Sequence, residues 1–329
     1  MPNTPQDVPE APKPWQASLE AIGKRALDRQ AQPDHSSRPR VLADREGDPA
    51  PVTTTAAEAA AQEVEEARQA GQLGYMARVT VQASLPVSDP HSQVYVRRNA
   101  HKMVLRVTSL KGEGLPYGSL ARLLLTWATT EAVRTRSPEL RLGHSLQEFL
   151  NKLELGRSGG AKGDITRLRR QTSRLFSCAI SADYSDISQD SFTAVLIARQ
   201  HNLWWDPGNP EQLALWGSTV TLSGDFYQQL VAAPVPVDLA VIRQLRSSAL
   251  ALDIYAWATW RMSFLSRETA IPWEYLQDQF GSNYHRLRDF RRRFSQALAT
   301  VLKHYEAGIE PRSSGLLLRP SPPSVARRR

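Results

Sequence analysis

Residues 271–294 read IPWEYLQDQFGSNYHRLRDFRRRF, and this stretch decides the expected fold. Its apolar spacing predicts a short helix over Pro272–Phe280, a turn, and a long basic helix over Asn283–Tyr305. One face of the long helix is apolar: Leu287, Phe290, Phe294, Leu298 and Val301. The opposite face holds His285, Arg288, Asp289, Arg292 and Gln296. Such a helix packs on a domain through one face, while arginines at this pitch suit DNA phosphates or guanine edges.

The flanking sequence completes a recognisable order of elements. A long apolar helix is expected over Ala249–Phe264, before the quoted stretch. A β-hairpin is expected after it, with its turn at Arg312-Ser313-Ser314-Gly315 and a strand over Leu316–Leu318. Three helices followed by a hairpin is the winged-helix plan, a relative of the helix-turn-helix whose third helix enters the major groove.

The preceding half of the chain has the same order. Helices are expected over Ser119–Arg136, from the capping box of Ser145 and Glu148, and over Asp164–Ala179, followed by a β-rich stretch over Ile180–Trp205. Three tripeptides recur in order, and they argue for a duplication. They are Trp127-Ala128-Thr129 with Trp257-Ala258-Thr259, Glu148-Phe149-Leu150 with Glu274-Tyr275-Leu276, and Arg167-Leu168-Arg169 with Arg286-Leu287-Arg288.

The third helix of the first half is also amphipathic. Its polar face carries Thr166, Arg167, Arg170, Ser173, Arg174 and Ser177. A single helix of this kind is more often a solvated surface helix than a DNA-binding one. Two of them, each third in a winged-helix order, favour DNA binding. Arg291 and Arg293 lie on the flanks of the second helix and fit either interpretation.

The expected fold class is α+β, mainly helical with small β-hairpins, in two tandem winged-helix domains. Residues 1–74 form an N-terminal segment, disordered to about residue 54 and helical over Ala56–Gln72. The first domain spans 75–206 and begins with a strand over Met76–Leu85. The second spans 207–319, after the breaker Pro207-Gly208-Asn209-Pro210, and begins with a strand over Ser218–Leu222. Residues 320–329 form a basic, proline-rich tail.

Charge and composition fit a nucleic-acid partner. The net charge is +8; residues 1–75 carry −4, so the remainder carries +12. No run of about 18 apolar residues suggests a membrane helix, and the single cysteine, Cys178, is consistent with a cytoplasmic location. No histidine and cysteine spacing suggests a metal site. The loop Gly156–Gly163 fails the phosphate-loop pattern at Ala161 and Gly163. We expect no cofactor, no metal and no catalytic residues.

Several long stretches resemble the plasmid-encoded RepA replication initiators. They include Leu115–Leu153 (LPYGSLARLLLTWATTEAVRTRSPELRLGHSLQEFLNKL), Asp164–Ile180 (DITRLRRQTSRLFSCAI), LALDIYAWATWRM and the quoted stretch at 271–294. The resemblance runs from about Tyr75 to Pro323. It implies a non-enzymatic protein that binds repeated double-stranded DNA at a plasmid origin, promotes duplex opening, and recruits host initiator and helicase proteins.

Alternatives remain at this point. A winged-helix transcriptional repressor would have the same fold, and it predicts one inverted site at a promoter. A primase or nickase is disfavoured by the missing catalytic pattern. The apolar strand Phe192–Ala198, in the presumed wing of the first domain, is either a surface for self-association or the buried middle of a sheet.

Overall fold

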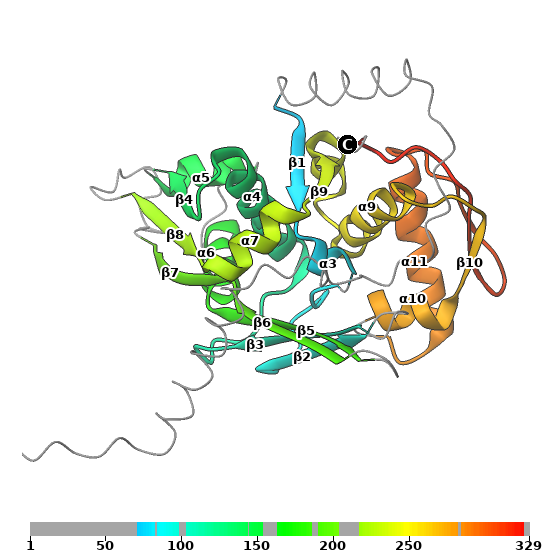
Figure 1. Cartoon of the computed structure of the whole chain (residues 1–329), viewed down its shortest axis with the longest axis horizontal. Coiled ribbons are helices and arrows are strands. Elements are labelled where there is room, and N and C mark those ends of the chain that lie inside the picture. The colour runs from blue at the N-terminus through cyan, green and yellow to red at the C-terminus, as the bar shows by residue number, and fades with distance from the viewer. Residues whose placement is uncertain are drawn as a thin grey trace, which may run out of the picture. The chain divides into compact units, whose positions relative to one another are not determined.

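The computed structural model describes residues 71–82, 84–98, 103–143, 145–153, 163–185, 190–203, 217–281 and 284–325 (Figure 1). These residues belong to one compact unit. They form an α+β fold of helices and small antiparallel sheets, which confirms the expected fold class. The expected disorder of residues 1–54 and the helix over Ala56–Gln72 fall almost wholly outside the described residues.

The second winged helix follows the expected order closely. It comprises α9 (Ala249–Met262), β10 (Thr269–Pro272), α10 (Trp273–Phe280), α11 (Leu287–Leu302), β11 (Ile309–Pro311) and β12 (Gly315–Leu318). The strands form a sheet in the order β10-β12-β11, so β11 and β12 are the hairpin wing. The strand β10 is an addition to the sequence-based expectation.

The first winged helix has the same topology. It comprises α4 (Gly118–Thr135), β4 (Glu139–Gly143), α5 (Leu146–Lys152), α6 (Asp164–Phe176), β7 (Ala198–Asn202) and β8 (Ser218–Leu222). Its sheet order is β4-β8-β7, which matches β10-β12-β11 strand for strand. The Ser145 side chain caps α5 by accepting a hydrogen bond from the Glu148 amide at 3.1 Å, as the capping box predicts. The shared topology supports the internal repeat.

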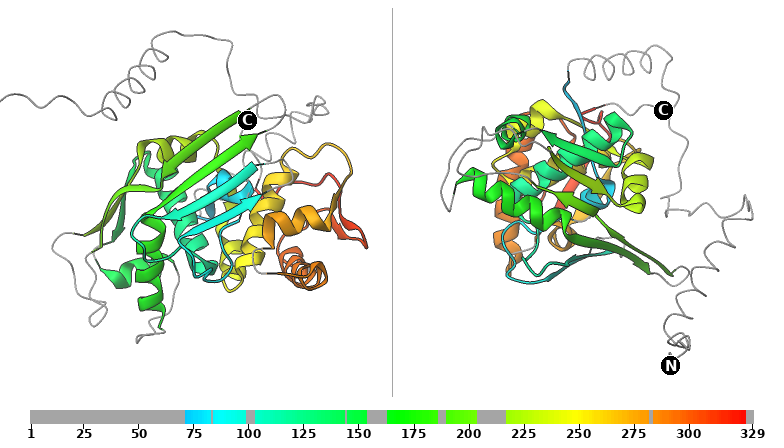
Figure 2. Two further views of the ribbon diagram at one scale, coloured as in Figure 1. Left: turned by 90° about the horizontal axis from the view of Figure 1, so that it is seen from below. Right: turned by 90° about the vertical axis from the view of Figure 1, so that its left-hand side faces the viewer.

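An extra sheet distinguishes the first winged helix from the second. The strands β5 (Cys178–Ser185) and β6 (Asp190–Leu196) follow α6 and pair with each other. They join β2 (Val94–Arg98) and β3 (Met103–Ser109) in the antiparallel order β2-β3-β5-β6. Figure 2 shows these four strands side by side as one layer. The strand expected in the presumed wing is thus an edge of this sheet, and the wing is the β7–β8 hairpin.

One expected strand is confirmed but belongs to the first winged helix, and another expected strand is wrong. Ser218–Leu222 is a strand, but it pairs with β4 and β7 of the first winged helix. The proposed boundary at Pro207 therefore falls between paired strands, and α7 (Gly224–Ala232) places Phe226 and Leu230 in the first core. Met76–Leu85 is not one strand: β1 (Leu73–Met76) gives way to α3 (Arg78–Gln82). Burial of Ala77, Val81 and Leu85, four residues apart, suits a helix rather than a strand.

Two hydrophobic cores lie beneath these elements. The first gathers the apolar faces of α4, α5 and α6 with the inner sides of β3 and β5. The second gathers α9, α10 and α11, with an aromatic cluster of Trp273, Phe280, Phe290 and Phe294 in edge-on contacts. Leu123 of α4 is part of the second core. The two winged helices therefore pack directly on each other.

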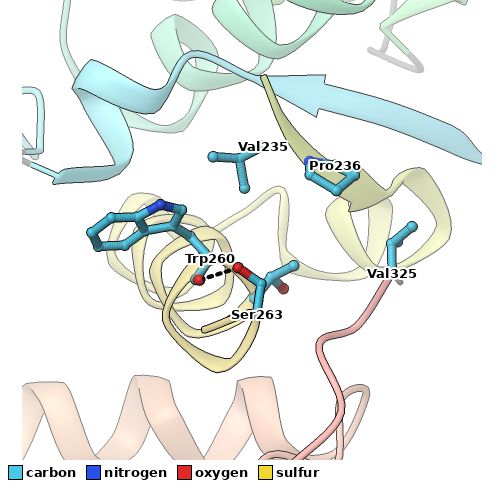
Figure 3. Close-up of a pocket in the computed structure, with 6 residues that line it drawn as sticks. Val235, Pro236, Trp260, Ser263 and Val325 are labelled. Atoms are coloured by element: carbon cyan, nitrogen blue, oxygen red, sulfur yellow. Dashed lines mark hydrogen bonds between the residues drawn. The ribbon is translucent and has the colours of Figure 1, made fainter. Parts of the chain in front are cut away.

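A short ribbon and the C-terminal segment brace this arrangement. β1 pairs with β9 (Val235–Asp238), which precedes α8 (Leu239–Leu245). Gly74 of β1 lies so close to Leu239 and Thr130 that an added Cβ would clash with Leu239. The Tyr255 hydroxyl contacts the Ser324 hydroxyl at 2.8 Å. Val325 lines a small pocket together with Val235, Pro236, Trp260 and Ser263 (Figure 3). The first part of the expected tail is thus packed against the second winged helix.

Candidate nucleic-acid interface

The helix α11 divides into a buried and a basic face, as its sequence predicts. Phe290, Phe294, Leu298 and Val301 are fully buried at the three- and four-residue spacing of one helix face. The exposed side carries the predicted polar residues Arg288, Arg292 and Gln296, with Asp289 half-buried beside them. His285, also exposed, lies two residues before the helix begins rather than on it. Asp289 and Arg292 are a loose pair, 3.9 Å apart between Oδ1 and Nη2. The guanidinium group of Arg292 therefore remains accessible to a ligand.

A basic groove runs between α11 and the β11–β12 hairpin. Its lining residues are Trp273, Arg288, Arg291, Arg292, Ser295, Pro311, Arg312 and Ser313. Arg291 lies over the Trp273 ring, 5.4 Å from the centroid, and the Trp273 indole donates a 3.0 Å hydrogen bond to the Arg312 carbonyl. Trp273 therefore ties the wing to the helix. The groove brings four arginines to one surface, which suits a polyanion.

Two of these arginines extend the sequence-based site. Arg291 was undecided between the two faces, and the structure places it in the groove. Arg312 was missed, because its place depends on the wing folding back beside α11. The sequence signal that could have identified Arg312 was its position in the expected wing turn, Arg312-Ser313-Ser314-Gly315. Glu310 pairs with Arg312 at 2.7 Å and with Arg319 at 3.2 Å, so the wing is partly neutralised from within.

The helix α6 presents fewer accessible cations. Ile165, Leu168, Thr172 and Leu175 are buried, which matches the expected apolar face. Arg167 and Arg170 are exposed and Thr166 is half-buried. Arg167 approaches Asp164 one turn earlier, at 3.5 Å. Arg170 is therefore the best-placed of the predicted phosphate ligands on this helix.

Arg174 and Ser173 are engaged within the protein. Arg174 Nη1 donates to Asp89 at 2.8 Å and to the Leu115 carbonyl at 3.3 Å, and its side chain is only 12% exposed. Burial would raise the pKa of the Asp89 carboxyl, but the Arg174 hydrogen bond and charge, with the His91 amide, hold that pKa below its usual range. The Ser173 hydroxyl donates to Glu113 at 2.7 Å. This geometry favours a structural role for both residues.

The wing of the first winged helix adds a cation that sequence reasoning missed. Arg199 lies exposed on β7, and β7 packs beside α6. The hairpin was not recognised as a wing from sequence, because its second strand was assigned to the other domain. The tip of this wing, including Trp204-Trp205, lies outside the described residues, as does most of the loop Gly156–Gly163.

Other chemistries find little support in the described part of the chain. No three His, Cys, Asp or Glu side chains there lie close enough to hold a metal ion. Burial raises the pKa of the Cys178 thiol to about 12, so this cysteine is not a reactive nucleophile. None of the helices described is both long and apolar enough to cross a membrane.

Of three comparisons with known proteins, one bears on the protein family. No curated protein matches the chain. A crystal structure of domain 2 and domain 3 of RctB resembles it with a TM-score of 0.42 and 13% identity, over 68% of this chain and 82% of that one; at this level the likeness does not bear on function. The family model described as plasmid encoded RepA protein matches residues 115–275, from before α4 into α10. Over these residues, just under half of its length, the chain is similar to the plasmid-encoded RepA proteins.

Proposed function

We propose that this protein is a non-enzymatic plasmid replication initiator that binds repeated double-stranded DNA sequences at the origin. The observation that carries the proposal is the four-arginine groove between α11 and its wing. Winged helices bind DNA with the third helix, and this groove lies on the accessible side of that helix. The similarity to plasmid-encoded RepA proteins suggests that the DNA bound is the replication origin of a plasmid.

The two winged helices would divide the contact with DNA. Arg288 and Arg292 project from α11 at the pitch needed to reach base edges in the major groove. Arg291 and Arg312, beside them, would hold the flanking phosphates. On the first winged helix, Arg167, Arg170 and Arg199 would contact the backbone, since that face offers few side chains suited to base recognition. Together the two would cover about two turns of duplex.

The proposal includes duplex opening beside the repeats and recruitment of host initiator and helicase proteins. It also includes self-association through the extra sheet. Val94 and Val96 on β2 and Leu196 on β6 are 47%, 45% and 43% exposed, and all three lie on the outer face of that sheet. An exposed apolar sheet face of this kind favours contact with a second copy.

Footprinting on the plasmid DNA that flanks the gene tests the proposal. We expect protection of tandem repeats of about two helical turns each, beside an A·T-rich stretch. The variant Arg288→Ala/Arg292→Ala should abolish the footprint, and Lys303→Ala, at the distant end of α11, should retain it. A parallel transformation with origin-containing and origin-deleted plasmids separates initiator from repressor. A single inverted site at a promoter, with replication independent of the protein, would refute the initiator role.

A further inference from the structure

The first helices of the two winged helices are joined by a buried ion pair. Arg122 of α4 and Asp253 of α9 form two hydrogen bonds, Nε to Oδ1 and Nη2 to Oδ2, each 2.6 Å long. The side chains are 3% and 6% exposed. They occupy nearly equivalent places in the repeat, five residues before Trp127 and four before Trp257. The ion pair therefore lies where the two copies of the winged helix meet.

Arg122 uses all five of its N–H donors at this junction. Besides the two bonds to Asp253, Nη1 donates to the carbonyls of Pro86 at 3.0 Å and Gly118 at 2.8 Å. Nη2 also donates to the Leu85 carbonyl at 2.7 Å. The guanidinium group is planar and its donors point in fixed directions. The five bonds together therefore fix α9 relative to α4 and to the segment 84–86.

Residues 81–84, just before Leu85 and Pro86, make further hydrogen bonds toward α10 and α11. The Ser84 hydroxyl donates to the Gln279 carbonyl at 3.0 Å, and the Gln279 side-chain amide donates to the Val81 carbonyl at 3.3 Å. Gln279 lies in the last turn of α10, the helix that leads into α11. Buried hydrogen bonds to residues between Val81 and Pro86 thus connect this segment to α4 on one side and to the last turn of α10 on the other.

Stability alone does not account for an ion pair at this place. Removing two charges from water is costly, and apolar side chains of similar volume often give equal or greater stability. Apolar contacts, however, tolerate small shifts between helices, whereas a bidentate Arg–Asp pair has one favourable geometry. What the pair adds to the surrounding apolar contacts is a defined relative position of the two winged helices.

We propose that the Arg122–Asp253 pair holds α6 and α11 at one separation and rotation, so that the protein selects DNA by the spacing between the two segments it reads. This inference rests on the proposed function. Both residues are positioning residues, since neither is accessible to DNA. One inserted base pair moves the second segment by about 3.4 Å and turns it by about 34°. A fixed pair of winged helices cannot follow that change.

The positional part is tested on the free protein, without DNA. Spin labels on Arg169→Cys in α6 and Ala299→Cys in α11, both exposed positions, report the distance between the helices by pulsed electron paramagnetic resonance. Buried Cys178 stays unlabelled. We expect one narrow distance distribution in the parent, and a broadened or shifted one in Arg122→Met/Asp253→Leu. The matched control Glu131→Gln/Arg134→Met removes an ion pair that lies within α4, and it should leave the distribution narrow.

The selective part is tested on a footprinted origin repeat, with and without one base pair inserted at its centre. The insertion should weaken binding by the parent at least about tenfold, and by Arg122→Met/Asp253→Leu about threefold or less. An unchanged distance distribution in that variant would overturn the inference even if DNA binding is confirmed. So would an equal insertion penalty in both proteins. If DNA binding itself fails, the distance measurement still decides the positional part. Asp253→Asn, which keeps the shape of the side chain but removes its charge, is a second variant for both measurements. If neither Asp253→Asn nor Arg122→Met/Asp253→Leu folds, the ion pair is required for folding and the inference is withdrawn.

Discussion

The two third helices, α6 and α11, share a place in the fold but differ in how their arginines are held. On α11, Arg288, Arg291 and Arg292 line an open groove beside the wing. On α6, Arg174 is committed to Asp89 and the Leu115 carbonyl, which leaves Arg170 and Arg167 nearer the solvent. The two winged helices thus share a packing pattern and differ on their exposed faces. We infer that α11 carries most of the sequence recognition and α6 mainly supports it.

The largest expected effect concerns Arg174 as a structural residue. Arg174→Ala removes a mostly buried charged hydrogen bond to Asp89, so the free energy of unfolding should fall by about 1.5–3 kcal/mol. Urea denaturation measures this. Arg170→Ala, an exposed change on the same helix, is the control and should change stability little.

DNA binding by folded Arg174→Ala should keep its dependence on salt concentration. A decrease in the salt slope, without loss of stability, would place Arg174 on a phosphate instead. In that case α6 would use its arginines for DNA contact as α11 is proposed to do.

The next prediction concerns base recognition by α11. Arg288→Ala or Arg292→Ala should weaken specific binding by about 1–3 kcal/mol and relax preference at one position of the repeat, if the side chain reaches a base edge. Titration against the natural repeat and single-base variants measures both effects. Lys303→Ala, at the far end of α11, is the matched control. Normal binding by either folded variant would remove that residue from the interface.

A smaller effect is expected for Arg170→Ala on α6. Loss of one phosphate contact reduces the slope of log affinity against log salt by about 0.9, whatever the DNA sequence. At 0.1 M salt this corresponds to a loss of affinity of about eightfold. Arg134→Ala, on α4 and paired with Glu131, is the control. An altered sequence preference with an unchanged salt slope would show that α6 also reads bases.

The long amphipathic elements could be predicted from sequence because their signals are local. The expected helix Ser119–Arg136 is α4 within one residue at each end, and the buried phenylalanines of α11 follow its periodicity. What depends on distant partners could not be predicted. The β8 strand was found, but its pairing with β4 joins residues about eighty positions apart. The strand β10 has only four residues and shows no clear period. The strand β4 is as long as β8, and its alternation of Leu140 and Leu142 with charged residues was a signal that was not used.

The candidate site also combines features that follow from local sequence with features that depend on distant residues. The exposed arginines of α11 follow from helix geometry, whereas the pairing of Arg174 with Asp89 spans 85 positions. Arg122 and Asp253 gave a signal that was not used. Each is the only charge in an otherwise apolar stretch of its helix, LARLLLTWA and LALDIYAWA. A charge in such a place requires a buried partner, but sequence alone does not say which one.

The smallest expected effect on DNA binding comes from the extra sheet, which only the first winged helix carries. Leu196 is exposed on its outer face, while Val195 and Ile197 on either side are buried. Leu196→Lys therefore probes the surface, and Val195→Lys or Ile197→Lys would instead place a charge in the core and unfold the protein. If the sheet joins two copies, Leu196→Lys and Val96→Lys should each shift sedimentation from dimer to monomer and leave binding to a single repeat unchanged. Thr193→Lys, also exposed but on a polar position of β6, is the control. A monomeric parent, or a dimer unaffected by both substitutions, would remove the sheet as the site of self-association and leave the two winged helices distinguished only by their DNA-facing arginines.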